Sequence, residues 1–232
     1  MKKLLTLVFL FQVCFLFGQV SVNEAKLNVF GNPFYAANEN YINMLSKLEE
    51  KGSSQMLFDD WTIMSVEGMD GKIMQVDSAN YSIDVDKVYF INDGRLYELY
   101  KHTVKQFTLG NHLFRNIVTR GKDFSAHYYE VLADGEFQLL KKYLIKTSSS
   151  SNHPMGIKTA NSQKVVKDTS FFYYDTKRSK LEKLPKNKGK LIGIFGRGND
   201  SLIQFANQND LSAKSEDDLK KLFNFYNSNR DQ

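Results

Sequence analysis

Three glycines in front of a predicted helix are the first residues that suggest a chemistry: Gly193, Gly196 and Gly198, in the segment GIFGRGND. Glycine-rich turns at a helix N-terminus bind phosphate in many proteins, because their backbone N–H groups point at the anion. No Lys-Ser or Lys-Thr pair follows here, and the gaps between the glycines are in the wrong order for a dinucleotide fingerprint. The apolar residues of GKLIGIF have helical spacing, so we favour a short helix that ends at Gly196 over a phosphate loop.

Histidines are the next candidates for chemistry, and the chain has four of them: His102, His112, His127 and His153. The first three fall on neighbouring predicted strands, so they could converge on a metal ion, but exposed strand histidines are far commoner than metal ligands. The sequence has no H-E-x-x-H motif and no Cys/His pair at ligand spacing. We therefore expect neither a metal nor a cofactor.

Carboxylates offer a third chemistry, because a pair of them can hydrolyse a glycosidic bond even when the partners are distant in the chain. Candidates on predicted strands are Glu67, Glu98 and Glu130, and the alternation of polar residues places each of them on a solvent face. Asp84 and Asp86 lack the glycine and glutamate of a calcium loop, so we expect them to be strand-edge acids. No G-x-S-x-G elbow is present, and the function we expect is therefore non-enzymatic.

One basic run stands out in the sequence, KRSKLEKLPKNKGK. We favour a solvated hairpin and loop with Glu182 inside the run, and the functional alternative is a patch that binds an anionic lipid surface, lipopolysaccharide or an acidic partner. The overall charge does not argue for a nucleic-acid partner, since it is only +5 at a pI of about 9.0. The residues of this run are Lys177, Arg178, Lys180, Lys183, Lys186, Lys188 and Lys190.

The first nineteen residues are typical of a secretory signal peptide. Two lysines precede an apolar run from Leu4 to Phe17, and small Gly18 follows. The run is shorter than the roughly 18–20 residues of a membrane span, so we expect export and no transmembrane span in the mature chain. Cys14 is the only cysteine and would leave with the signal, so the hydrophobic core alone must stabilise the exported protein. The expected location is the periplasm or cell envelope, with the extracellular space as the alternative.

A run of short strands must position most of the candidate residues, over a β domain of 53–184. Asp93-Gly94 is a two-residue hairpin signature that sets Phe90 opposite Tyr97. Further turns are predicted at 68–71, 110–111, 134–135 and 176–179, and a Ser-rich loop at 147–163. Successive strands with short turns predict an antiparallel meander, curled into a roll or partial barrel. The lack of βαβ alternation excludes a doubly wound nucleotide-binding fold.

Helices are predicted at both ends of this β domain. Residues 20–52 form an N-terminal lead-in, with an amphipathic helix from about Tyr35 to Glu50. Residues 185–232 form a cluster of two or three short helices, packed on the β domain through wide apolar stripes. The last helix has Ser215 as its N-cap and buries Leu219, Leu222, Phe223 and Tyr226. The predicted fold class is therefore α+β.

This order of features resembles an uncharacterised family of exported proteins from Gram-negative bacteria. The motifs that carry the resemblance are Trp61 with the turn Asp70-Gly71, the block YEVL-x-x-G-x-x-x-LLKKY over 129–143, and the tail DDLKKLFNFYN. The longer N-terminal lead-in and the Ser-rich insert depart from the family's pattern. The resemblance implies export but no established activity, so no functional residue can be carried over.

Three functions from different classes remain open. The first is a non-enzymatic envelope protein that binds a partner or scaffolds a complex. The second is a carrier of a small apolar or lipidic ligand inside the curled sheet. The third is a hydrolase with dispersed carboxylates. A large apolar cavity would favour the carrier, whereas an exposed aromatic patch would favour the binding protein.

Overall fold

The protein has an α+β fold, in which one open antiparallel sheet carries a small layer of helices. The computed structural model describes residues 35–37, 55–120, 124–149, 163–196 and 199–229. The predicted signal peptide and most of the predicted N-terminal helix lie outside these residues. The strands are β1 (Tyr35–Ala37), β2 (Thr62–Gly68), β3 (Ile73–Ser82), β4 (Lys87–Asn92), β5 (Arg95–Leu99), β6 (Val104–Leu109), β7 (His112–Arg120), β8 (Phe124–Ala133), β9 (Phe137–Ser149), β10 (Gln163–Asp175) and β11 (Lys180–Lys183). The helices are η2 (Lys101–Thr103), α2 (Lys188–Gly193), α3 (Asp200–Gln208) and α4 (Glu216–Ser228).

The expected helix from Tyr35 to Glu50 is wrong at its first three residues. Tyr35–Ala37 forms β1, which pairs antiparallel with β5. An edge strand satisfies the backbone groups of β5 that a helix would leave unpaired. The rest of the predicted helix lies outside the described residues.

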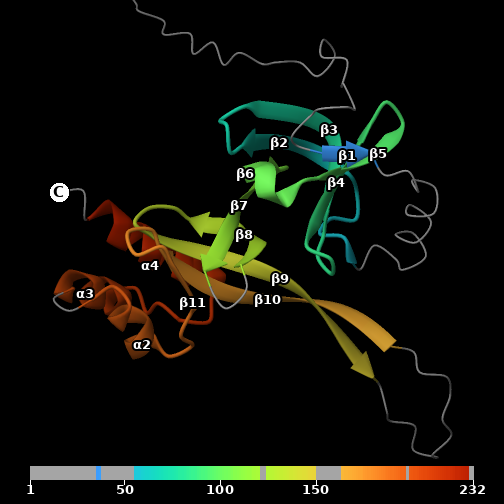
Figure 1. Ribbon diagram of the computed structural model, residues 1–232. Coiled ribbons are helices and arrows are strands. Elements are labelled where there is room, and N and C mark those ends of the chain that lie inside the picture. Colours follow the sequence, from blue (N-terminus) through green and yellow to red (C-terminus); the bar gives the residue numbers. More distant parts are fainter. Residues whose placement is uncertain (1–34, 38–54, 121–123, 150–162, 197–198, 230–232) are drawn as a thin grey trace, which may run out of the picture.

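The sheet consists of two meanders rather than one (Figure 1). β2 to β5 follow one another outwards, but β6 then pairs with β2 instead of β5, and β6 to β11 continue outwards on the other side. The short η2 makes the return, and the backbone N–H of Met69 donates to the carbonyl of Thr103 where the connection passes the end of β2. The pairing with β6 satisfies the backbone groups on the second edge of β2. In a single meander these groups would hydrogen-bond only with water.

The predicted turns are confirmed. Asp93 and Gly94 have φ values of 48° and 69°, as a type I′ hairpin requires, and Phe90 pairs with Tyr97 as expected. The Ser-rich loop is shorter than predicted, because Thr147–Ser149 and Gln163 belong to β9 and β10. Their backbone groups extend the long ladder between these two strands, which outweighs the polar composition.

Strands β2 to β8 enclose the first hydrophobic core, which we call the strand core. Phe107 stacks on Phe114 at 4.9 Å between ring centroids, and Tyr128 meets Phe107 edge-on at 5.0 Å. Tyr81 adds a further edge-on contact to Tyr128. The remaining buried members are Met64, Val66, Val76, Ala79, Ile83, Val88, Phe90, Tyr97, Leu99, Val104 and Leu109.

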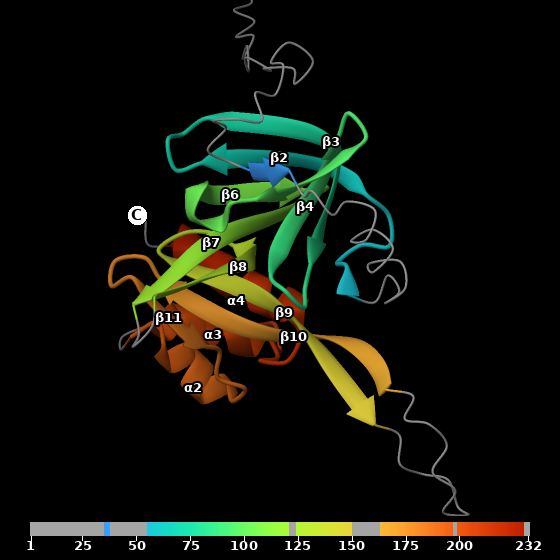
Figure 2. The ribbon, with the colours of Figure 1, turned by 45° about the vertical axis from the view of Figure 1, so that its right-hand side comes forward.

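The C-terminal helices cover β8, β9 and β10 and form the second core, which we call the helix core (Figure 2). The predicted helix α4 is confirmed: the Ser215 side chain accepts a hydrogen bond from the backbone N–H of Asp218. α2 is also confirmed, with Gly196 in the left-handed region beyond its end at φ 93°. The buried helix residues include Leu191, Phe195, Leu202, Ala206, Leu219, Leu222, Phe223 and Tyr226.

Candidate functional site

A groove lies where the β8–β9 turn and the β10–β11 turn meet the helices. It consists of two adjoining cavities of about 550 and 340 Å³. Glu136 and Lys177 line both of them. The larger cavity is bounded by Asp134, Gly135 and the last turns of α4, and the smaller one is lined by charged side chains together with four apolar or aromatic ones. These are Phe137, Ile194, Phe195 and Tyr226, and the three aromatic rings among them are largely buried in the helix core.

Asn227 on α4 holds the helix against the β8–β9 turn. Its side-chain N–H₂ group donates to the carbonyls of Asp134 at 3.0 Å and Phe137 at 2.9 Å, and its side-chain oxygen accepts from the N–H of Phe137. Gly135 permits this approach, because a Cβ there would lie 2.4 Å from Cγ of Asn227. Its φ of 142° also disfavours any other residue. The turn that the sequence predicts is therefore also a docking point for the helix.

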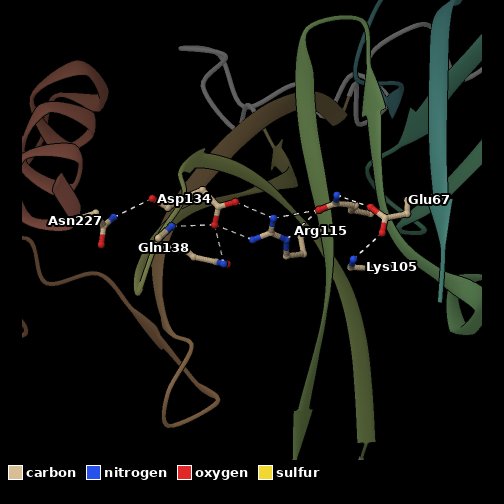
Figure 3. A network of polar contacts seen from close by, with 8 residues as sticks. Glu67, Lys105, Arg115, Asp134, Gln138 and Asn227 are labelled. Carbon is tan, nitrogen blue, oxygen red and sulfur yellow. Dashed lines mark hydrogen bonds and ion pairs between the residues drawn. The ribbon is translucent and has the colours of Figure 1, made fainter. Parts of the chain in front are cut away.

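A chain of polar contacts runs from this turn across the sheet to β2 (Figure 3). Both guanidinium N–H groups of Arg115 donate to the Asp134 carboxylate, at 3.0 and 2.9 Å, and Gln138 donates to the same carboxylate at 2.9 Å. The Arg115 guanidinium holds the pKa of Asp134 below its usual value. Arg115 also donates to Gln106, which donates in turn to Glu67. Asp134 is thereby fixed in place from both sides.

Paired charges border the groove on its other side. Nζ of Lys177 lies 2.7 Å from a carboxylate oxygen of Glu136, so the two turns face each other through an ion pair. Asp175 is 4% exposed and accepts a hydrogen bond from the backbone N–H of Arg178. The groove therefore has a rim on which both signs of charge occur, next to rings that are largely buried in the helix core.

The structure divides the basic run of the sequence into separate groups. Lys177 and Arg178 lie at the groove, and Lys180 pairs with Glu182 at 2.7 Å. Lys183 and Lys190 are exposed. Lys186 and Lys188 line another cavity, between the start of α2 and the α3–α4 loop.

Glu130 is the most enclosed candidate carboxylate, and the expectation that it faces solvent is wrong. It lies between the two cores and accepts hydrogen bonds from Lys141, His112 and Tyr143, at 2.6–2.7 Å. Burial raises its pKa, but the hydrogen bonds from Lys141, His112 and Tyr143 outweigh this, so the pKa lies below the usual value. Lys141 also reaches Glu216 on α4, so the group links the helix to the sheet. The expectation fails because both faces of β8 are covered here: Tyr128, on the same face as Glu130, belongs to the strand core, and Tyr129 on the other face packs with Ile117 and Leu140.

Asp86 organises a second polar group, at the β3–β4 turn. Its carboxylate accepts hydrogen bonds from the Tyr81 hydroxyl at 2.7 Å, from Lys101 at 2.6 Å and from the His127 ring at 2.8 Å. Asp86 has a φ of 53°, in the left-handed region that only a locally hydrogen-bonded residue adopts readily. It also caps the free edge of β8 through the backbone N–H of Tyr128. This group therefore joins three segments of the strand core.

The candidate ligands for metal and for hydrolysis do not converge in the described residues. His112 contacts Glu130, His127 contacts Asp86, and His102 stacks on Tyr100. Among the residues that the structure describes, no group of three or more His, Cys, Asp or Glu could hold a metal ion. Glu67 and Glu98 are engaged by Lys105 and Lys87 on different parts of the sheet. His153 lies outside the described residues.

Sequence reasoning located the turns of the groove but missed the residues that give it its shape. The signal for the turn was Asp134-Gly135, whereas Asn227 and Arg115 carry no local motif. Their roles depend on contacts with residues 90 and 19 positions away.

No described helix has the length and apolar character needed to cross a bilayer. Comparisons of the chain with protein-family models, curated proteins and solved structures find no match.

Proposed function

We propose that this protein is an exported, non-enzymatic binding protein of the cell envelope, and that a segment of a partner protein docks in the groove between the β8–β9 turn, the β10–β11 turn and α4. The observation that carries this proposal is the composition of the groove. Charged and amide side chains of the two turns and of α4 line the groove, and such a lining suits a polar, charged segment of a partner protein.

The rigidity of the groove also supports a binding role. Asn227 and the carboxylate of Asp134 fix the β8–β9 turn from opposite sides, so the binding surface is formed before the partner arrives. Preformed surfaces lose less conformational entropy on association than flexible ones. The proposed export rests on the signal-like N-terminus and on the family resemblance.

The alternative of a ligand carrier has less support. For the curled part of the sheet we propose the roll form expected from the sequence, but its interior is filled by the rings of Phe107, Phe114 and Tyr128. A carrier would need room for its ligand at this place. The hydrolase alternative needs two neighbouring carboxyl groups in a cleft, whereas Glu67, Glu98 and Glu130 each contact a different lysine.

Site-specific photocrosslinking in the envelope of producing cells tests the proposal. A crosslinking amino acid at Asn224, which is exposed and lines the larger cavity, should capture one protein that mass spectrometry can identify. The same amino acid at Asn207, an exposed asparagine of α3 that does not line the groove, should not capture it. Equal capture from both positions would contradict a partner site in the groove.

The purified partner then gives the quantitative test. Asn224→Arg places a long cation in the groove without touching the core, and we expect it to weaken binding at least tenfold in calorimetric titration. Asn207→Arg is the matched control, because it makes the same change on an exposed helix position and should bind like the unmodified protein. If Asn224→Arg binds as tightly as the control, the groove is not the binding surface.

A further inference from the structure

A second, smaller cavity brings together lysines that are distant in the sequence. The segment before α2 and the loop between α3 and α4 enclose about 340 Å³, and the Nζ of Lys188 donates to the carbonyl of Ala206 at 3.0 Å, which ties the two parts together. Lys186 comes from the first segment and Lys214 from the loop. The remaining lining includes Asp210, Leu211 and Ser212. We call this the lysine pocket.

The charge of the lysine pocket is positive and largely uncompensated. Three lysines face one acidic residue, Asp210. The ammonium groups of Lys186 and Lys214 make no hydrogen bond or ion pair with the residues that the structure describes. Two uncompensated cations at one cavity create a local potential that attracts an anion.

The acidic first turn of α4 does not neutralise this pocket, because its carboxylates have other partners. Glu216 pairs with Lys220 at 2.8 Å and with Lys141 at 3.2 Å. Asp218 reaches the pocket, since its carboxylate accepts a hydrogen bond from the backbone N–H of Ser212 at 3.1 Å, but Lys221 at 3.7 Å compensates its charge. The Ser212 hydroxyl accepts from the backbone N–H of Lys214, which leaves its own proton for a ligand oxygen.

The first lysines of the basic run differ from those of the lysine pocket, because carboxylates compensate their charge. Lys177 pairs with Glu136 and Lys180 with Glu182, both at 2.7 Å. Lys183 and Lys190 are exposed but line none of the three cavities described above. Only Lys186 and Lys188 of the run meet a further lysine, Lys214, which lies outside the run and which sequence reasoning did not single out.

We propose that the lysine pocket binds a phosphate-type oxyanion, held by Lys186, Lys188 and Lys214 with the Ser212 hydroxyl as a further donor. Charge-assisted hydrogen bonds from several ammonium groups are the usual way to hold such a group. The phosphate belongs either to the headgroup of an anionic envelope lipid or to a soluble phosphorylated molecule. The lysine pocket is separate from the groove between the β8–β9 turn, the β10–β11 turn and α4, which we call the partner groove. The proposal for the lysine pocket does not depend on the function proposed for the partner groove.

Two titrations of the exported protein at low salt test the proposal and distinguish the two sources. Inorganic pyrophosphate is titrated by calorimetry, and binding to vesicles of phosphatidylglycerol and phosphatidylcholine is compared with binding to phosphatidylcholine alone by co-sedimentation. Lys186→Gln with Lys214→Gln should lower the affinity for the bound anion about tenfold or more. Lys183→Gln with Lys190→Gln is the matched control, since it removes the same charge from exposed positions of the run, and it should change the affinity less than about threefold.

Each outcome decides one point. Binding to pyrophosphate and to the anionic vesicles, both weakened by the pocket variant, assigns the site to a lipid headgroup. Binding to pyrophosphate alone, weakened in the same way, assigns it to a soluble phosphate. Equal losses from the pocket and control variants would show a diffuse charge effect and overturn the proposal, as would the absence of binding to either ligand. Asn224→Arg in the partner groove should leave both titrations unchanged, so that failure of one proposal is distinguishable from failure of the other.

Discussion

The strand core and the helix core share one face of β9, yet they are closed in different ways. Phe137 and Leu139 belong to the helix core, whereas Tyr143 and Ile145 further along the same face pack on the strand core. Lys141 lies between them and pairs with Glu130. The strand core consists mainly of residues from strands β2 to β8 and is filled with rings. The helix core is covered by short helices whose ends meet two turns, and the cavities lie there. The two cavities for which we propose ligands thus lie where separate elements meet, rather than inside the continuous sheet.

The largest effect should come from truncating a ring of the strand core. Phe107 is 1% exposed and contacts two other rings, so Phe107→Ala should lower the free energy of unfolding by about 3–5 kcal/mol. The comparison is Phe225→Ala in the helix layer, where the ring stacks on Phe205 but is only half-buried, and about 1–2 kcal/mol is expected. Urea denaturation measures both. Equal losses would contradict the idea that the two cores differ in enclosure.

Breaking the junction between the cores should come next. Glu130→Gln removes the charge that Lys141, His112 and Tyr143 stabilise, and because Glu130 is 5% exposed we expect a loss of about 3 kcal/mol at neutral pH. The variant should also change the dependence of stability on pH.

The sign of that pH dependence follows from the lowered pKa of Glu130. A carboxylate with a depressed pKa in the folded state stabilises the protein fully above its unfolded pKa of about 4.3. This contribution is lost as the pH falls through the lower folded value. The difference in unfolding free energy between the unmodified protein and Glu130→Gln should therefore be constant from pH 5 to 7 and shrink below about pH 4. A difference that stays constant down to pH 2 would show that Glu130 contributes to stability through packing alone.

The contact between α4 and the β8–β9 turn should have a smaller but strongly coupled effect. Asn227→Ala leaves the backbone groups of Phe137 and Asp134 without a partner, and we expect a loss of about 2 kcal/mol. Gly135→Ala should cost a similar amount, because the added Cβ collides with the Asn227 side chain and the residue must keep a positive φ. In the double variant the collision disappears, so the two losses should sum to clearly more than the measured total. Strict additivity in chemical denaturation would show that the two residues act independently.

The difference between local and distant contacts explains which parts of the fold could be predicted from the sequence. Turn residues and caps act within a few positions, so Asp93-Gly94 and Ser215 predicted the β4–β5 hairpin and the start of α4 correctly. The return of β6 to β2 depends on which free edge is satisfied, and no local pattern states that. The strand at Tyr35–Ala37 was missed for the same reason, since it depends on pairing with β5.

For the candidate sites, too, local composition could be read from the sequence, whereas contacts with distant residues could not. The basic run was visible as composition, but its division between the partner groove and the lysine pocket depends on Glu136, Asp210 and Lys214, which come from other segments. Glu130 was expected to face solvent because alternation assumes one exposed face, whereas both faces of β8 are covered at this position. A sequence pattern thus gives the charge available to a site, whereas the partners that neutralise or expose that charge come from the fold.

The smallest effect should come from the ion pair on the rim of the groove. Lys177 is 70% exposed at its side chain and lies 2.7 Å from Glu136, and exposed pairs of this kind contribute little because water screens them. We therefore expect Lys177→Gln to change the free energy of unfolding by less than about 0.5 kcal/mol. A loss larger than about 1 kcal/mol in urea denaturation would place this pair among the contacts that hold the helix core together. A small loss, combined with weaker binding of the partner, would instead show that the rim serves recognition, because a charge that does not stabilise the fold remains available to contact a second protein.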